Sequence, residues 1–362
     1  MTTTSTALPR WTLLTPIAAW IVLCAGLLLP GHAPLLVLVL VGIALAGAVF
    51  AGVHHAEVVA HRVGEPFGTL VLAVAVTVIE VALIVSVMIG GGPEKAGLAR
   101  DTVFAAVMIV CNGIVGLCLL MGGLRHREQD FQIRGASAAL AVLASLSVLS
   151  LVMPNYTSQN LGPMLSPSQL AFAGVSSLVL YCVFVFVQTV RHRDYFLAAG
   201  DGEHHHAAPP SARVAMVSAA LLLVSLVAVV LLAKLLSPAV EAAVREAGLP
   251  EAVVGIVIAA LVLLPEGLAA LRAARADRLQ TSLNLALGSA LASIGLTIPT
   301  VAVVTLGFHM PLALGIGGRD TVLLVLTLIV GTLTLGTGRT TILQGAVHLS
   351  LFAAYLFLSV AP

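Results

Sequence analysis

The sequence predicts an all-α polytopic membrane protein of about eleven transmembrane helices, arranged as one extra N-terminal helix and two inverted five-helix repeats. Three observations predict this fold class. First, 59% of the 362 residues are apolar, 9% are charged and the mean hydropathy is +1.10, values typical of polytopic membrane proteins. Second, most of the chain consists of apolar runs long enough to cross a bilayer as helices. Third, Glu80 and Glu266 occupy similar apolar settings in the two halves of the chain, which suggests one site built by duplication.

The predicted spans follow one another with short polar connections. They are residues 11–29, 34–57, 68–90, 102–122, 135–153, 167–190, 213–236, 250–273, 281–306, 320–337 and 341–361. The last two are the hardest to separate, because only a short segment with Gly336, Gly338 and Arg339 stands between them. We expect helices because a chain that crosses lipid must satisfy its own backbone hydrogen bonds.

Lysine and arginine residues set the expected orientation. With the N-terminus inside, the outer segments carry five of the 17 basic residues, and the inner segments carry the remaining twelve. The outer five are Lys95, Arg100, Lys234, Arg245 and Arg319. Because basic residues favour the cytoplasmic side, we expect a multi-pass membrane protein with a cytoplasmic N-terminus.

This orientation gives the two halves opposite topologies. The span that holds Glu80 runs from inside to outside, and the span that holds Glu266 runs from outside to inside. Inverted repeats of this kind bring corresponding positions together near the bilayer midplane in secondary transporters. The expected organisation is an N-terminal tail and extra helix (1–33), a first five-helix repeat (34–190), a cytoplasmic linker (191–212) and a second five-helix repeat (213–362).

Two connections have features of their own. The linker between the repeats contains the run His204–His206, which fits either a solvated tether or a cation- or pH-sensing segment. Residues 237–248, which begin with Ser237 and Pro238, have the pattern of a short amphipathic surface helix that ends at Gly248.

The two intramembrane glutamates are the main candidates for function. Holding a glutamate protonated at pH 7 costs about 4 kcal/mol, and leaving it ionised and uncompensated in a low-dielectric site costs at least several kcal/mol. Glu80 and Glu266 are therefore expected to be either protonated or neutralised by a cation. Protons and cations then compete for the same oxygens, which is the physical basis of antiport. The alternative for either residue alone is a protonated glutamate hydrogen-bonded to a neighbouring helix.

Other oxygen-bearing side chains, on the Glu80 span and on the spans 102–122 and 281–306, suit a hard cation such as Ca2+, Na+ or K+. The candidates are Thr77, Asn112, Ser289 and Ser293. Small hydroxyl residues also occur in transmembrane helices because they allow close packing and bond to their own backbone. For each serine and threonine, this structural role therefore remains an alternative to ion binding.

A second polar cluster lies at the inner end of the second span. His54, Glu57 and His61 fall on one helical face, with His55 beside them. This set suggests either an intramembrane metal-dependent hydrolase or a role in proton transfer or helix packing. The adjacent His-Glu followed by His that is typical of zinc proteases is absent, which favours the second interpretation, with His55, Glu57 and His61 as proton-path or structural residues.

The sequence resembles the cation/proton exchanger (CAX) family of the calcium/cation antiporter superfamily, in particular the bacterial ChaA-type calcium or sodium–potassium/proton antiporters. The resembling stretches run from His55 to Glu80, from Gly248 to Glu266, and from Leu285 to Pro299. The resemblance implies ten core helices plus one extra, central ion sites at Glu80 and Glu266, and exchange of a cation against protons. It also implies a place in a bacterial plasma (inner) membrane. Family members usually carry an Asn three residues before each acidic residue; Thr77 and Leu263 stand there in this sequence, and we expect this difference to change ion preference.

The sequence therefore predicts a secondary antiporter that exports Ca2+, Na+ or K+ in exchange for H+, and not an enzyme. No bound cofactor is expected, since cation and proton are the substrates, and the partners are these ions and the lipid bilayer. The net charge of +1 argues against a nucleic-acid partner. A channel or a Na+-driven exchanger remains an alternative within transport, and the sequence leaves open whether the chain forms a homo-oligomer.

Overall fold

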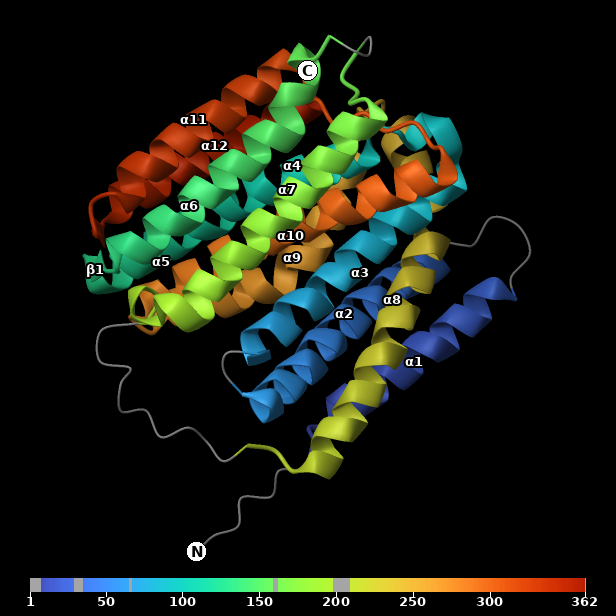
Figure 1. The fold of residues 1–362 in the computed structure, drawn as a ribbon. Coiled ribbons are helices and arrows are strands. Elements are labelled where there is room, and N and C mark those ends of the chain that lie inside the picture. The colour runs from blue at the N-terminus through green and yellow to red at the C-terminus, as the bar shows by residue number, and fades with distance from the viewer. Residues whose placement is uncertain (1–7, 29–34, 65–66, 159–161, 198–208, 362) are drawn as a thin grey trace, which may run out of the picture. The chain divides into compact units, whose positions relative to one another are not determined.

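The computed structural model describes residues 8–28, 35–64, 67–158, 162–197 and 209–361, and its helices are shown in Figure 1. The described chain forms two compact units. Unit 1 comprises Met1–Val87 and His204–Ala247, and unit 2 comprises Met88–Glu203 and Gly248–Pro362. Each unit is described by itself below. The histidine run 204–206 lies outside the described residues.

Unit 1 consists of four helical segments. They are α1 (Arg10–Leu27), α2 (Leu35–Val63), most of α3 (Phe67–Gly91) and α8 (Ala212–Glu246). Glycines allow close approach of these helices: a Cβ atom on Gly52 of α2 would lie 3.6 Å from Ser225 of α8 and 3.7 Å from Ile79 of α3. The indole of Trp20 also donates a hydrogen bond to the carbonyl of Val224 (3.2 Å), which joins α1 to α8.

Unit 2 contains the remaining helices and a short two-stranded sheet. Its elements are η1 (Gly92–Lys95), α4 (Leu98–Met108), η2 (Ile109–Ile114), α5 (Val115–His126), β1 (Gln129–Asp130), α6 (Ile133–Ser147), η3 (Val148–Val152), η4 (Met153–Tyr156), α7 (Pro167–Phe186), η5 (Val187–Arg191), η6 (Arg193–Tyr195), α9 (Ala252–Arg275), α10 (Leu279–Phe308), α11 (Gly318–Leu335), β2 (Arg339–Thr340) and α12 (Ile342–Val360). The elements α4, η2 and α5 form one continuous helix in which η2 is a π-helical segment.

Helix α10 is the core of unit 2, because it contacts α4, η2, α5, α6, α7 and α9. Its glycine and proline positions allow close packing on α7. A Cβ atom on Gly295 would lie 2.8 Å from the Cβ of Tyr181, and Gly174 of α7 lies against Pro299 and Ala302. Removing the side chain at such contacts lets two apolar helices pack closely.

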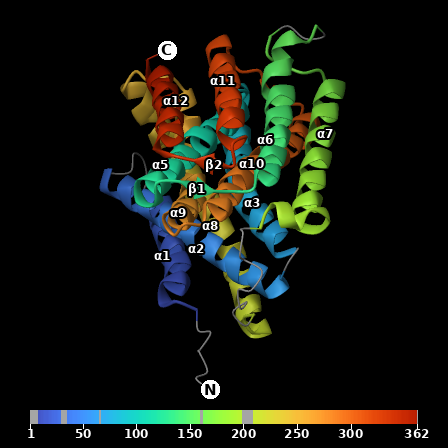
Figure 2. The same cartoon turned by 90° about the vertical axis from the view of Figure 1, so that its left-hand side faces the viewer.

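Two loop pairings at opposite ends of α6 support the inverted repeat. At one end, β1 pairs antiparallel with β2, with Gln129 opposite Thr340 (Figure 2). At the other end, the amides of Leu314 and Gly315 both lie 3.0 Å from the carbonyl oxygen of Pro163. In the first pairing, the connection after the third helix of the first predicted repeat meets the connection after the fourth helix of the second repeat. In the other pairing these roles are exchanged: the connection after the fourth helix of the first repeat meets the one after the third helix of the second. Inverted repeats relate two such pairings to each other.

The fold class is confirmed. Ten helices among the described residues are long and apolar enough to cross a membrane, and α3 adds an eleventh apolar helix, described as such over residues 77–90. The predicted spans match the observed helices, although α2 continues to Val63 and so carries His61 within the helix. The repeat boundaries themselves stay a prediction.

The expected separate surface helix at 237–248 is wrong. Helix α8 is continuous from Ala212 to Glu246 and contains Pro238 in its interior. The alanine-rich sequence after Pro238 continues the helix, and the Ser237 hydroxyl donates to the Glu241 carboxylate one turn further on (2.9 Å). A transmembrane helix tolerates an internal proline when neighbouring groups satisfy the freed backbone. The predicted stop at Gly248 is in place, since this residue has φ +67°.

Candidate functional site

Glu80 lies on α3 within unit 1 and is 2% exposed. Thr77, three residues earlier and on the same side of the helix, is 3% exposed. The flanking residues Ile79 and Val81 are also buried, so Glu80 lies on a buried stretch of an apolar helix. Such a position makes ionisation costly unless a cation or another polar group compensates the charge.

Glu266 lies on α9 within unit 2 and is half-buried. The residue before it, Pro265, is inside the helix and cannot donate a hydrogen bond to the carbonyl of Leu261. The residue after it, Gly267, lies against the π-helical segment: a Cβ atom there would be 3.1 Å from Cδ1 of Ile114. Glu266 therefore stands at an irregular point of α9 that packs closely on η2.

Asn112 lies at the centre of the π-helical segment and is completely buried. Its amide nitrogen donates to the hydroxyl of Thr327 on α11 (2.8 Å), and its amide oxygen lies 3.2 Å from Nδ1 of His348 on α12. A π-helical turn interrupts the regular spacing of a helix and often occurs at functional sites. The structure thus places Asn112 in a polar network of unit 2, with one lone pair of its oxygen beyond the bond to His348.

Ser289 and Ser293 lie one turn apart on α10, with Ser289 half-buried and Ser293 3% exposed. Helix α10 contacts both α9 and η2, which carry Glu266 and Asn112. Unit 2 therefore brings the helices of four predicted site residues together, and unit 1 holds the other two, Glu80 and Thr77.

The histidine cluster of α2 does not form a metal site. Nδ1 of His54 is 4.0 Å from Glu57, whose side chain is 54% exposed, and His61 is exposed at the helix end. His55 is buried instead, with Nε2 3.0 Å from the carbonyl oxygen of Thr12 on α1. Among the described residues, no group of three or more His, Cys, Asp or Glu side chains could hold a metal ion. His55 thus fastens the extra helix to α2.

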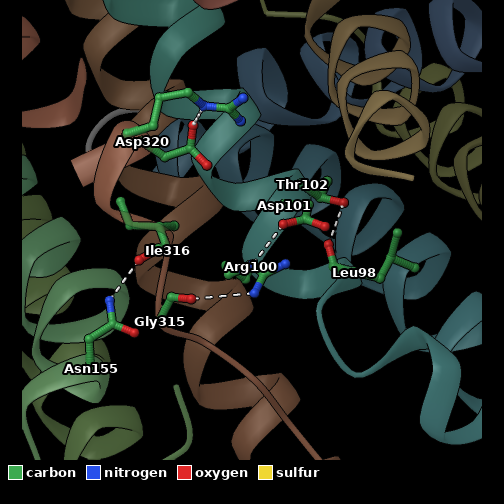
Figure 3. Close-up of polar contacts among 9 residues, drawn as sticks. Leu98, Arg100, Asp101, Thr102, Asn155, Gly315, Ile316 and Asp320 are labelled. Atoms are coloured by element: carbon green, nitrogen blue, oxygen red, sulfur yellow. Dashed lines mark hydrogen bonds and ion pairs between the residues drawn. The ribbon is translucent and has the colours of Figure 1, made fainter. Parts of the chain in front are cut away.

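A further polar cluster lies in unit 2 where α4 begins (Figure 3). Arg100 forms an ion pair with Asp101 (2.7 Å) and donates to the carbonyl of Gly315 (3.3 Å), and Asn155 donates to the carbonyl of Ile316 (2.6 Å). These bonds hold the 309–317 connection on α4 and on the end of the α6 helix. The sequence predicts Arg100 only as an outer charge; its ion-pair partner Asp101 is the next residue, but the carbonyl of Gly315 lies 215 residues further along the chain.

Sequence reasoning also missed His348. It is the only ionisable residue within the predicted span 341–361 apart from Tyr355, and it is 2% exposed. An ionisable side chain inside a membrane helix is by default a functional-site hypothesis, and this signal was present in the sequence. Its hydrogen bonds to residues of η2 and α11 are visible only in the tertiary structure.

The membrane-spanning helices and the comparisons with known proteins together define the class: an integral multi-pass transporter for cations. A family model described as sodium/calcium exchanger protein matches residues 33–190 and 217–361, and the chain belongs to this family. The enzyme alternative is therefore wrong, since the homologues are transporters.

Two relatives match over most of their length. The y4hA protein of Sinorhizobium fredii, whose name describes an ionic transporter, is 52% identical over 99% of this chain and 98% of its own. The sodium-potassium/proton antiporter ChaA of Escherichia coli is 34% identical over 87% of this chain and 86% of its own.

Solved structures share the fold at low identity. The native structure of YfkE matches with a TM-score of 0.74 at 16% identity, covering 97% of this chain and all of the other. The H+/Ca2+ exchanger CAX matches with a TM-score of 0.72 at 14% identity, covering 96% of this chain and 88% of the other. These matches confirm the all-helical exchanger fold.

Proposed function

We propose that this protein is a secondary antiporter that exports a cation, Ca2+, Na+ or K+, in exchange for protons. The observation that carries the proposal is that each half of the chain places one glutamate in the middle of an apolar helix. These are Glu80 on α3, which is only 2% exposed, and Glu266 on α9. The name of the relative at 34% identity, a sodium-potassium/proton antiporter, supports exchange against protons.

Glu80 and Glu266 are the groups for which cation and proton compete. A carboxylate as buried as Glu80 is stable when it is protonated or when a cation compensates its charge, and either state excludes the other at the same oxygens. Thr77, Ser289, Ser293 and the amide oxygen of Asn112 supply further oxygen ligands, which suit a hard cation. Alternating access then comes from one helix group moving past the other, as in transporters built from inverted repeats.

The same proposal places the protein in a bacterial inner membrane with its N-terminus in the cytoplasm. The excess of basic residues on the predicted inner segments supports this orientation. A reporter fused to the N-terminus, combined with labelling of single cysteines in the connections, would check it.

The test uses everted membrane vesicles that report the proton gradient with a fluorescent dye. Ca2+, Na+ and K+ are added separately across a range of pH, to the wild type and to Glu80→Gln and Glu266→Gln. We expect cation-dependent loss of the gradient in the wild type and at least a tenfold lower rate in both variants. Glu246→Gln, at an exposed position on α8, is the matched control and should keep the wild-type rate.

Two outcomes would overturn parts of the proposal. Full cation-dependent proton flux in both glutamate variants would remove Glu80 and Glu266 from the site. Cation flux that needs Na+ and no proton gradient would instead favour a Na+-driven exchanger, in keeping with the description of the family.

A further inference from the structure

The buried imidazole of His348 joins three helical segments of unit 2. On one side Nδ1 lies 3.2 Å from Oδ1 of Asn112 in the π-helical segment, and on the other Nε2 lies 3.1 Å from the hydroxyl of Thr334 on α11. The close contact of α12 with α5 makes this reach possible, because a Cβ atom on Gly116 would lie only 2.9 Å from the Cβ of His348.

The hydrogen bonds around Asn112 define which groups donate. The hydroxyl of Thr327 has two acceptors for its single proton, the carbonyl of Leu323 one turn back on α11 (2.8 Å) and Sδ of Met108 (3.5 Å), and the carbonyl is the nearer and stronger of the two. Thr327 must therefore accept from Asn112, so the amide nitrogen faces Thr327 and the amide oxygen faces His348. An amide oxygen only accepts, so Nδ1 of His348 carries the hydrogen.

The tautomer of the neutral ring follows from this assignment. With the hydrogen on Nδ1, Nε2 has a lone pair, and the hydroxyl of Thr334 donates to it. Both ring nitrogens are then satisfied by buried side chains of other helices. The ring orientation, the tautomer and the rotation of the Asn112 amide are thus set together.

This network continues to the candidate carboxylate of unit 2. Asn112 and Ile114 belong to the same π-helical segment, and Ile114 packs on Gly267, the residue directly after Glu266. Ile114 also packs against the buried cluster of Cys118, Ala270 and Ala274, whose two alanines lie further along α9. A change in the π-helical turn would therefore move the part of α9 that carries Glu266.

We propose that His348 is a positioning residue of the cation site: its Nδ1–H orients the Asn112 amide and holds the π-helical segment on which the Glu266 region of α9 rests. His348 does not itself bind the cation. This inference rests on the proposed function, because it assigns His348 to the same site.

The test compares three replacements of His348 in purified protein in liposomes, with flux measured against cation concentration. In His348→Asn the amide N–H stands close to the position of Nδ1, whereas in His348→Gln the amide reaches toward the position of Nε2. We expect His348→Leu and His348→Gln to raise the half-saturating cation concentration by about 10- to 100-fold, the usual effect of removing a group that orients a ligand. His348→Asn should stay within about threefold of the wild type.

A second readout does not depend on transport. In nitrogen-15 NMR spectra of histidine-labelled protein, the signals lost in His348→Asn belong to His348, and they should show the neutral tautomer with hydrogen on Nδ1. Thr334→Val should perturb these signals, whereas Thr332→Val, at an exposed position of the same helix, should leave them unchanged.

The outcomes separate the inference from the proposed function. Equal half-saturating concentrations in wild type, His348→Leu and His348→Gln, or a hydrogen on Nε2 of His348, would overturn the positioning role. A wild type that moves cations without protons would overturn the proton exchange but would leave the comparison of cation affinities intact. If His348→Leu fails to fold, the comparison of His348→Asn with His348→Gln and the NMR signals of His348 still test the positioning role.

Discussion

Ile114 and Gly267 lie in contact between the π-helical segment and α9: the position of a Cβ atom on Gly267 is 3.1 Å from Cδ1 and 3.3 Å from Cγ1 of Ile114. A methyl group at this position would meet Ile114 more closely than ordinary van der Waals distance, so any residue larger than glycine requires the Ile114 side chain to shift by a few tenths of an ångström. Because Gly267 follows Glu266 directly, the contact links the packing of the helices to the placement of the carboxylate.

Replacing Gly267 by alanine should reduce transport. The added methyl group would displace the Ile114 side chain by a few tenths of an ångström and so strain its packing on α9, and overpacking of this kind costs about 1–3 kcal/mol. We expect a several-fold lower rate of cation-dependent proton flux in vesicles, at an unchanged amount of inserted protein.

The second-site change Ile114→Ala provides the control. It removes both Cδ1 and Cγ1, the atoms that the new methyl group would meet. The double variant should recover most of the lost rate, and a double variant as slow as Gly267→Ala alone would contradict the packing explanation.

Gly345→Ala should destabilise unit 2. A Cβ atom there would lie 2.8 Å from Cα of Leu120 and also against its backbone nitrogen, so no side-chain rotation relieves the clash. Helix α12 would have to move away from α5, and we expect a clear drop in the melting temperature of the detergent-solubilised protein. Gly307→Ala on α10, where no atom lies within 4 Å of the new methyl group, should melt like the wild type.

The pairing of β1 with β2 should depend on its buried amide more than on its ion pair. Arg339 and Asp130 are 2.9 Å apart, but their side chains are 69% and 73% exposed, so Arg339→Ala should cost about 1 kcal/mol or less. Gln129 is 3% exposed and donates to the Ala274 carbonyl and to Asp277, both at 2.9 Å. Gln129→Leu should cost about 1–3 kcal/mol, because it leaves these acceptors without their donor.

Thermal unfolding at low and high salt would check this order. The loss in Arg339→Ala should shrink at high salt, because salt screens an exposed pair, and the loss in Gln129→Leu should not. A larger loss for Arg339→Ala than for Gln129→Leu would contradict the assignment.

Cation affinity should fall as the pH falls. Protonation of Glu80 and Glu266 removes the charge that attracts the cation, so lower pH favours the proton-bound state. Where binding of one cation displaces one proton, the half-saturating cation concentration should rise about tenfold for each unit of pH decrease. Flux measured against cation concentration at several pH values would check the slope, and a constant value across pH would contradict competition for shared carboxylates.

The contacts that hold the candidate site could not be predicted from the sequence. The sequence predicts Asn112 as an ion ligand because it is an amide in an apolar helix. Its hydrogen bonds to Thr327 and His348, however, join residues that are 215 and 236 positions apart in the chain. No local pattern marks such partners. The prediction of a separate surface helix at 237–248 was wrong for a related reason. A proline usually ends a helix in water, but Pro238 is tolerated within the transmembrane helix α8.

The sequence by itself determined the number and order of the helices, their expected orientation and the two acidic positions. These properties depend on the length and hydropathy of each apolar segment and on the charges beside it. Such features are local in the sequence, and they determine which segments insert into a bilayer and in which direction. Only the tertiary structure decided that α4 and α5 are joined by a π-helical turn, that His55 of α2 bonds to the Thr12 carbonyl of α1, and that His348 reaches Asn112. Such contacts form between helices that are distant in the sequence. Many ways of packing these apolar helices bury similar hydrophobic surface, and a glycine at a close contact or a single hydrogen bond favours one of them.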